Sequence, residues 1–293
     1  KKIIGKGNFG TVYKAFNTKT GQILAVKEIN LEDTEDDLCE IQKEIDMLRA
    51  CESQYVVKYY GCTLVGKHLW IVMEYMGGGS VRELIVNRVM PEQAIAIVLQ
   101  QVLNALDFLH KGRKIHRDIK AANILLNSDG DVKLADFGTG DVLQEDATKR
   151  MFTQQTGTQL YMAPEIKAQQ KYYTFLIDVY SLGMSIYRAC KSSIPVNELL
   201  TMDVNGLPEP IPEQYSQQFA DLVQKMLSYN PCDRSTIENI KETLLEIVTE
   251  KKLNDSEQKL FENSLNLFYG IDGVFDKDTA IKNFNKILEN SEN

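Results

Sequence analysis

The most specific pattern in this chain of 293 residues is His116-Arg117-Asp118-Ile119-Lys120-Ala121-Ala122-Asn123. It places a carboxylate, a lysine two positions later and an amide five positions later in one short stretch. This spacing suits phosphoryl transfer, because Asp118 can orient a hydroxyl that attacks phosphorus while Lys120 neutralises the transferring group. Asn123 can then hold one Mg²⁺. The alternative is a loop with scattered polar residues and no chemistry.

A second acidic motif, Asp136-Phe137-Gly138, begins 18 positions after Asp118 (118 to 136). Two short apolar runs lie between them, Leu125-Leu126 and Val132-Lys133-Leu134. This is the spacing of a β-hairpin, which would place Asp136 beside Asn123. Both side chains offer oxygen atoms, the ligands that Mg²⁺ prefers, so the sequence predicts a metal site at Asn123 and Asp136.

A glycine-rich stretch stands near the start of the chain: Gly5-Lys6-Gly7-Asn8-Phe9-Gly10-Thr11-Val12. Glycine lets the backbone come close to phosphate oxygens, to which its N–H groups can donate. By itself the pattern also fits a dinucleotide-binding turn, but that turn requires a helix directly after it. Here the β-rich run Thr11-Val12-Tyr13 follows instead, which disfavours the dinucleotide interpretation.

One lysine ends an apolar, strand-like run, Ile23-Leu24-Ala25-Val26-Lys27. A charge inside such a strand needs a partner. Apolar residues between positions 38 and 48 recur at three- and four-residue spacing, which predicts a helix after the strand. This helix offers Glu40 and Glu44, four positions apart and therefore on one face. Only one of them needs to point inward.

Composition limits the classes of partner. The formal net charge is −8, so the chain gains no general affinity for nucleic acid or for anionic membrane surfaces. There is no apolar run long enough to span a membrane and no signal-peptide pattern, so we expect no membrane insertion and a cytoplasmic location. The five cysteines show no metal-binding spacing and are expected to be reduced thiols. The abrupt start is compatible with a piece of a longer chain.

Five motifs occur in a fixed order: the glycine loop, Ala25-Val26-Lys27, His116-Arg117-Asp118, Asp136-Phe137-Gly138 and Ala163-Pro164-Glu165. With this order, residues 3 to about 248 resemble a eukaryotic protein kinase domain. Longer runs resemble the Hippo-like, germinal-centre-kinase branch of the sterile-twenty group. These runs are Tyr55-Val56-Val57-Lys58-Tyr59-Tyr60-Gly61, Leu69-Trp70-Ile71-Val72-Met73-Glu74-Tyr75, residues 114–127 and Lys133-Leu134-Ala135-Asp136-Phe137-Gly138.

The resemblance implies an α+β class with a bilobal kinase fold. A small lobe of strands with one helix would cover residues 1–76, and a large, mostly helical lobe would cover residues 80–248, together a kinase domain over 1–248. A linker at 249–255 and a C-terminal helical hairpin at 256–293 would follow.

The resemblance also implies an ATP site and catalytic roles. Glu44 would pair with Lys27, Met73 would stand behind the adenine pocket, and the backbones of Glu74 and Met76 would contact adenine. The implied catalytic residues are Asp118, Lys120, Asn123, Lys27 and Glu44. The implied ATP-binding residues are Ile4, Gly5, Lys6, Gly7, Asn8, Phe9, Gly10, Val12, Ala25, Lys27, Met73, Glu74, Met76 and Leu125, with Asn123 and Asp136 as Mg²⁺ ligands.

Lys120 and Thr158 resemble the serine/threonine form of the family, which implies protein substrates phosphorylated on serine or threonine in intracellular signalling. Glu165 and Arg234 would form a buried ion pair, and Asp178 would brace the catalytic loop. The alternative is a pseudokinase scaffold. It is disfavoured because the complete catalytic set is present: Lys27, Glu44, Asp118, Asn123 and Asp136.

The activation segment, residues 136–165, departs from the branch. The stretch before Gly157 is longer than in the branch, and Gln159-Leu160-Tyr161 stands where the branch usually has a proline-aromatic-tryptophan sequence. Arg117 could pair with a phosphate on this segment, on Thr153 or on Thr156. Our hypothesis is that phosphorylation of Thr153 activates the enzyme.

The tail around Phe268-Tyr269-Gly270 resembles a Sel1-like helical repeat, which implies a protein partner. The alternative is an ordinary amphipathic helix pair that packs on the kinase domain. A single repeat cannot bury its own apolar face, so the repeat interpretation requires further repeats or packing on the domain.

Overall fold

A computed structural model describes residues 2–7, 10–32, 38–86, 89–128, 130–137, 140–142, 150–151, 158–170, 172–191 and 209–250. Several predictions concern positions outside the described residues. These positions are Asn8, Phe9, the side chain of Glu40, Gly138, Thr153, Thr156, residues 251–255 and the tail at 256–293.

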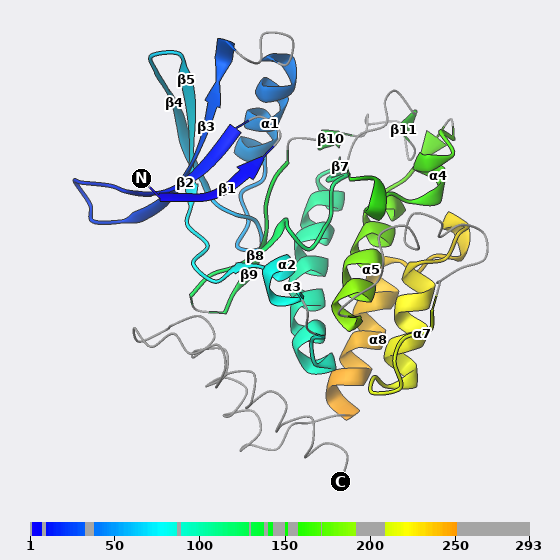
Figure 1. Cartoon of the computed structure of the whole chain (residues 1–293). Coiled ribbons are helices and arrows are strands. Elements are labelled where there is room, and N and C mark those ends of the chain that lie inside the picture. The colour runs from blue at the N-terminus through cyan, green and yellow to red at the C-terminus, as the bar shows by residue number, and fades with distance from the viewer. Residues whose placement is uncertain are drawn as a thin grey trace.

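The N-terminal lobe is one antiparallel sheet with a helix beside it (Figure 1). The strand order is β1-β2-β3-β5-β4. The link between β2 and β3 is a turn in which the Asn17 side chain accepts a hydrogen bond from the Lys19 N–H at 3.0 Å. The elements are β1 (Lys2–Gly7), β2 (Gly10–Phe16), β3 (Ile23–Asn30), α1 (Leu38–Ala50), β4 (Tyr59–Val65) and β5 (His68–Glu74).

The C-terminal lobe is mostly helical, with short strands where the motifs lie (Figure 1). Its helices are α2 (Val81–Leu84), α3 (Glu92–Lys111), α4 (Pro164–Lys167), α5 (Leu176–Cys190), α7 (Gln217–Met226) and α8 (Ile237–Glu250), with 3₁₀ turns η2 (Gln159–Tyr161) and η3 (Pro231–Asp233). Its strands are β6 (Gly79–Ser80), β7 (Lys114–Ile115), β8 (Ile124–Leu126), β9 (Val132–Leu134), β10 (Asp141–Val142), β11 (Arg150–Met151) and β12 (Tyr172–Tyr173).

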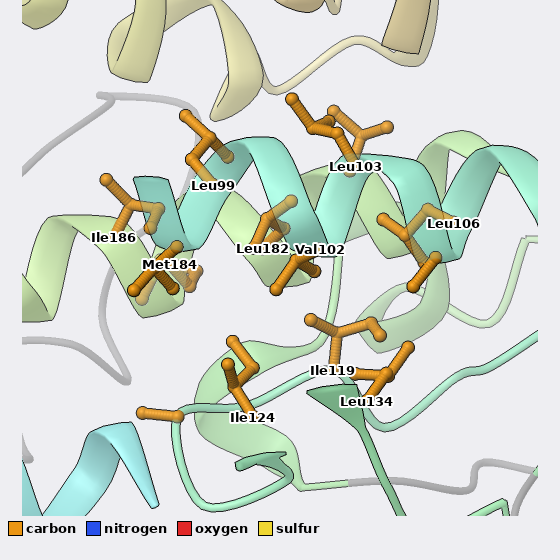
Figure 2. Packing of buried hydrophobic residues seen from close by; sticks show 14 of the residues in the cluster. Leu99, Val102, Leu103, Leu106, Ile119, Ile124, Leu134, Leu182, Met184 and Ile186 are labelled. Carbon is orange, nitrogen blue, oxygen red and sulfur yellow. The ribbon is translucent and has the colours of Figure 1, made fainter. Parts of the chain in front are cut away.

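Two long helices form the centre of this lobe. Apolar residues recur along α3 at helical spacing, and this stripe packs against the apolar face of α5 and the motif-bearing strands. Each of these side chains is almost wholly removed from water, so the motif loops rest on a close-packed core. Figure 2 shows Leu99, Val102, Leu103 and Leu106 with Leu182, Met184 and Ile186, and below them Ile119, Ile124 and Leu134.

The predicted α+β bilobal fold is confirmed. The hairpin expected between the two acidic motifs is the β8–β9 pair, in which Leu125 lies opposite Lys133. Helix α8 continues through Glu250, two residues into the stretch where the sequence predicts a linker. Among the described helices, none has both the length and the apolar character that crossing a membrane requires.

Candidate active site

One face of the small sheet carries several of the predicted ATP-binding residues. Val12 lies opposite Lys27 in the β2–β3 pair, and Ala25 lies opposite Met73 in the β3–β5 pair. Directly opposed residues share a face, as do residues two apart on one strand. These four residues, Val12, Ala25, Lys27 and Met73, therefore lie on one face of the sheet. On this face Lys27 contacts helix α1 through Glu44.

The buried pair on this face is Lys27 and Glu44. Lys27 Nζ lies 2.5 Å from Glu44 Oε1, and the two side chains are 9% and 3% exposed. The other oxygen, Glu44 Oε2, is buried and has no hydrogen-bond partner among the described residues. Burial raises the pKa of Glu44, Lys27 lowers it in part, and the nearby charge of Asp136 raises it again. The choice that the sequence left open falls on Glu44.

The glycine-rich stretch forms the β1–β2 pair. Gly5 lies opposite Val12, Lys6 opposite Thr11 and Gly7 opposite Gly10. Ile4 sits at a break in this register and is 42% exposed. A Cβ atom on Gly10 would lie 2.1 Å from the carbonyl oxygen of Glu28, so only glycine allows β2 to approach β3 this closely.

Asp118 is the most highly connected side chain of the site. Lys120 Nζ donates to its Oδ2 at 2.5 Å, and Asn123 Nδ2 donates to the same oxygen at 3.1 Å. The backbone N–H and the hydroxyl of Thr158 donate to its Oδ1 at 3.0 and 2.8 Å. Lys120 also donates to the Thr158 hydroxyl at 3.0 Å. The structure thus joins this short stretch of the loop to Thr158, 40 positions after Asp118, in one hydrogen-bonded group.

The buried carboxylate of Asp178 accepts hydrogen bonds from the catalytic loop, as the resemblance implies. The backbone N–H groups of His116 and Arg117 donate to Asp178 at 3.0 and 2.9 Å, and the ring of His110 lies 2.9 Å from it. Burial alone would raise the pKa of Asp178, but the hydrogen bond and charge of His110, with the contribution of His116, bring it below the usual range.

Asn123 and Asp136 come together at the β8–β9 hairpin. The Ala135 N–H donates to the Asn123 carbonyl at 2.9 Å, which places the next residue, Asp136, beside Asn123. Arg117 and Asp136 both have φ of 65°, a left-handed conformation that is uncommon for L residues and recurs at active sites.

These donors fit Mg²⁺. The Asn123 amide nitrogen donates to the carbonyl of Asp118 at 2.9 Å as well as to its side chain, which leaves Oδ1 of Asn123 as the atom that can bind a cation. Asp136 is exposed and adds carboxylate oxygens. Two oxygen donors together with substrate phosphates are the ligand set that Mg²⁺ prefers.

The segment joining the lobes, residues 74–78, is called the hinge. At its start the Glu74 N–H donates to the Lys58 carbonyl at 2.8 Å. Met76 is buried, and its carbonyl accepts from the Gly79 N–H at 3.4 Å. Leu125 lies in the other lobe, half-buried on β8.

The sequence interpretation missed one ion pair at this hinge. Lys133 Nζ lies 2.8 Å from each carboxylate oxygen of Glu74, and the Lys58 N–H donates to the same group at 3.2 Å. Lys133 stands inside the apolar run Val132-Lys133-Leu134, so the rule that identified a partner for Lys27 would have identified one here.

A second missed contact involves Arg117, whose Nη1 donates to the hydroxyl of buried Tyr173 at 3.4 Å.

Farther from the catalytic loop, the predicted pair of Glu165 and Arg234 is confirmed: two parallel bonds of 2.9 and 3.1 Å join side chains that are 2% and 0% exposed.

Comparison with known families agrees with this geometry. Residues 1–245 match the family model described as a protein kinase domain, which covers most of the chain. The chain therefore belongs to the protein kinase family. Membership supports phosphotransferase activity that uses ATP, usually with Mg²⁺, on protein substrates.

Proposed function

We propose that the chain is a catalytically active protein kinase specific for serine and threonine. The observation that carries this proposal is the group formed by Asp118, Lys120 and Thr158, joined by contacts of 2.5 to 3.0 Å. A carboxylate that accepts hydrogen bonds from a lysine and a hydroxyl can exchange the Thr158 hydroxyl for that of an incoming substrate. Asp118 would then orient this hydroxyl and accept its proton.

The other residues position ATP. Lys27, fixed by Glu44, would contact its phosphates, and Lys120 would offset the charge that develops on the transferring group. When bound at Asn123 and Asp136, Mg²⁺ supplies positive charge beside the phosphate oxygens. Positioning and electrostatic stabilisation account for nearly all of the catalysis in such a site.

The nucleotide pocket is proposed from the remaining residues. The shared sheet face of Val12, Ala25 and Met73 supports an adenine site that Leu125 closes from the other lobe. The backbone groups of Glu74 and Met76 would contact the ring, with Met76 acting through its N–H. The glycine-rich stretch from Ile4 to Gly10, including Asn8 and Phe9, would cover the phosphates.

The second candidate is a pseudokinase scaffold that binds partners without chemistry. The intact Lys27–Glu44 pair at 2.5 Å favours the enzyme over this candidate. The deciding experiment incubates the chain with Mg²⁺, ATP and a generic basic protein, followed by phosphoamino-acid analysis. We expect phosphoserine and phosphothreonine with the wild type and none with Asp118→Asn. Equal incorporation by both proteins would rule out the enzyme, and phosphotyrosine would rule out the specificity.

Three finer points rest on the sequence alone and stay proposals. The first is a cytoplasmic signalling role within the sterile-twenty group, and the second is activation by phosphorylation of Thr153. Full activity of a Thr153→Ala protein would contradict the second. The third is the division into a kinase domain at 1–248, a linker at 249–255, whose first two residues continue α8, and a Sel1-like helical pair at 256–293 that binds a protein partner.

A further inference from the structure

A cavity of about 410 Å³ lies behind the hinge, apart from the residues proposed to bind ATP or the acceptor. Its volume falls within the range of small-molecule sites, roughly 300–1,000 Å³. The wall includes the end of α1, the loop after it, the start of β4 and one residue of β9. The wall carries the ionisable side chains of Arg49, Glu52, Lys58, Tyr59 and Lys133.

The wall has an excess of positive charge. Among the described residues, no carboxylate pairs with Arg49 or with the ammonium group of Lys58. The Arg49 guanidinium lies 4.0 Å from the Cys62 sulfur and close to the Tyr59 hydroxyl, and the Lys58 ammonium lies 5.8 Å from the centre of the Tyr60 ring. Glu52 is the one acidic residue on the wall. Arginine binds phosphate oxygens through two parallel hydrogen bonds, so this wall favours a phosphate group.

A hydroxyl group adds to this preference. The Tyr59 hydroxyl oxygen is buried, lies near Arg49 and Cys62, and completes no hydrogen bond of good geometry among the described residues. A buried hydroxyl without a partner is unfavourable, so a ligand that supplies an acceptor beside Arg49 would satisfy it.

The same wall holds the start of the hinge. The contacts of the Glu74 carboxylate come from Lys133 Nζ, at 2.8 Å to both oxygens, and from the Lys58 N–H at 3.2 Å. Both residues line the cavity. An anion that binds Lys133 would compete with Glu74 and release the side chain whose backbone is proposed to contact adenine.

We propose that this cavity is a binding site for a phosphate group, either on a phosphorylated side chain or as the free ion. Its occupancy alters nucleotide affinity through Lys133 and Glu74, and nucleotide alters phosphate affinity by the same factor. The coupling rests on the proposed nucleotide site, whereas phosphate binding in the cavity does not.

The binding test is calorimetric titration of the whole chain at constant ionic strength. The chain is first saturated with Mg²⁺ and a non-hydrolysable ATP analogue, so failure of the nucleotide site is recognised separately. Inorganic phosphate is then titrated in one arm and a phosphoserine peptide in the other. We expect saturable binding in at least one arm, weakened about tenfold in Arg49→Gln and in Lys58→Gln. Lys225→Gln, which changes an exposed lysine on α7, is the matched control and keeps wild-type affinity.

The arm that binds identifies the source of the phosphate. Absence of saturable binding in both arms would overturn the proposal, as would unchanged affinity in both cavity variants. Coupling is tested with adenosine, which has no phosphates of its own. Phosphate should change adenosine affinity at least fivefold in the wild type and leave it unchanged in Glu74→Gln. Equal effects in both proteins would overturn the coupling.

Discussion

Two buried ion pairs, one in each lobe, are built differently. Arg234 and Glu165 in the helical lobe form two parallel bonds, and the remaining N–H groups of Arg234 donate to the carbonyls of Leu176, Ser228 and Tyr229. Lys27 and Glu44 in the small lobe share one contact, and Glu44 Oε2 has no partner among the described residues. The first pair is complete in its hydrogen bonds, and the second is not.

The difference indicates which pair supports the fold and which supports the reaction. A buried carboxylate oxygen without a partner costs roughly 1–3 kcal/mol, and native proteins keep such defects mainly where function needs them. Glu44 keeps Lys27 on the sheet face beside the proposed ATP site. Arg234 and Glu165 face no proposed ligand, and they join helix α4 to the loop before α8.

The largest effect expected is on stability, from Arg234→Ala. This change leaves Glu165 as a buried charge without its partner, and the free energy of unfolding should fall by roughly 3–5 kcal/mol. Urea denaturation measures it. Arg82→Ala is the control, because Arg82 is exposed on α2 and should change stability by less than about 0.5 kcal/mol. A loss below 1 kcal/mol for Arg234→Ala, by the same measurement, would end the distinction between the two pairs.

The second prediction concerns activity. Lys27→Met should lower kcat/KM by about 10²–10³-fold, because it removes the charge that we propose contacts the ATP phosphates. The midpoint of thermal unfolding should stay close to that of the wild type, since Glu44 can take up a proton when its partner is lost. Lys19→Met, in an exposed turn, is the matched control. A collapse of stability in Lys27→Met would show that this pair supports the fold as well.

The third prediction is a pH dependence. Because the pKa of Glu44 is raised in the folded state, the folded chain binds more protons than the unfolded chain above pH 4.5, the ordinary value. Stability relative to Glu44→Gln should therefore fall as pH rises from about 4.5, by at most ~1.4 kcal/mol per pH unit. Asp178 acts oppositely, because its lowered pKa gives stability that is lost only below pH 3.8. Urea unfolding at several pH values separates the contributions of Glu44 and Asp178. If the difference in free energy of unfolding between the wild type and Glu44→Gln does not change with pH, the prediction is wrong.

The two pairs also show how far the sequence predicts such a site. A lysine in an apolar strand requires a partner, so the Lys27 contact follows from local pattern, although only packing selects Glu44. The same reasoning was available for Lys133 and Glu74. By contrast, no local pattern indicates that Arg117 contacts Tyr173, because these residues are 56 positions apart and meet only through the folded core.

The fold, too, is predicted in part by local sequence patterns and in part only by packing. The apolar spacing between positions 38 and 48 predicts helix α1, and the β-rich run after the glycine loop and the hairpin spacing predict the strands around the site. The bond from Thr158 to Asp118 could not be derived from spacing, since it depends on where the chain returns after 40 positions. The resemblance to the kinase family singled out Thr158 but did not predict this bond. Periodicity thus predicts the elements, and tertiary packing decides which polar groups meet.

The smallest expected effect refines the description of the complete pair. The Arg234 guanidinium lies 5.0 Å from the centre of the Tyr180 ring, and burial raises the pKa of Tyr180 to about 12. If the ring stabilises Arg234 through its π face, Tyr180→Phe should change the free energy of unfolding by less than about 0.5 kcal/mol, whereas Tyr180→Leu should lose about 2 kcal/mol. Urea denaturation of both variants decides this. A larger loss for phenylalanine would mean that the hydroxyl, rather than the ring, supports the pair, and that Arg234 is held by polar contacts alone.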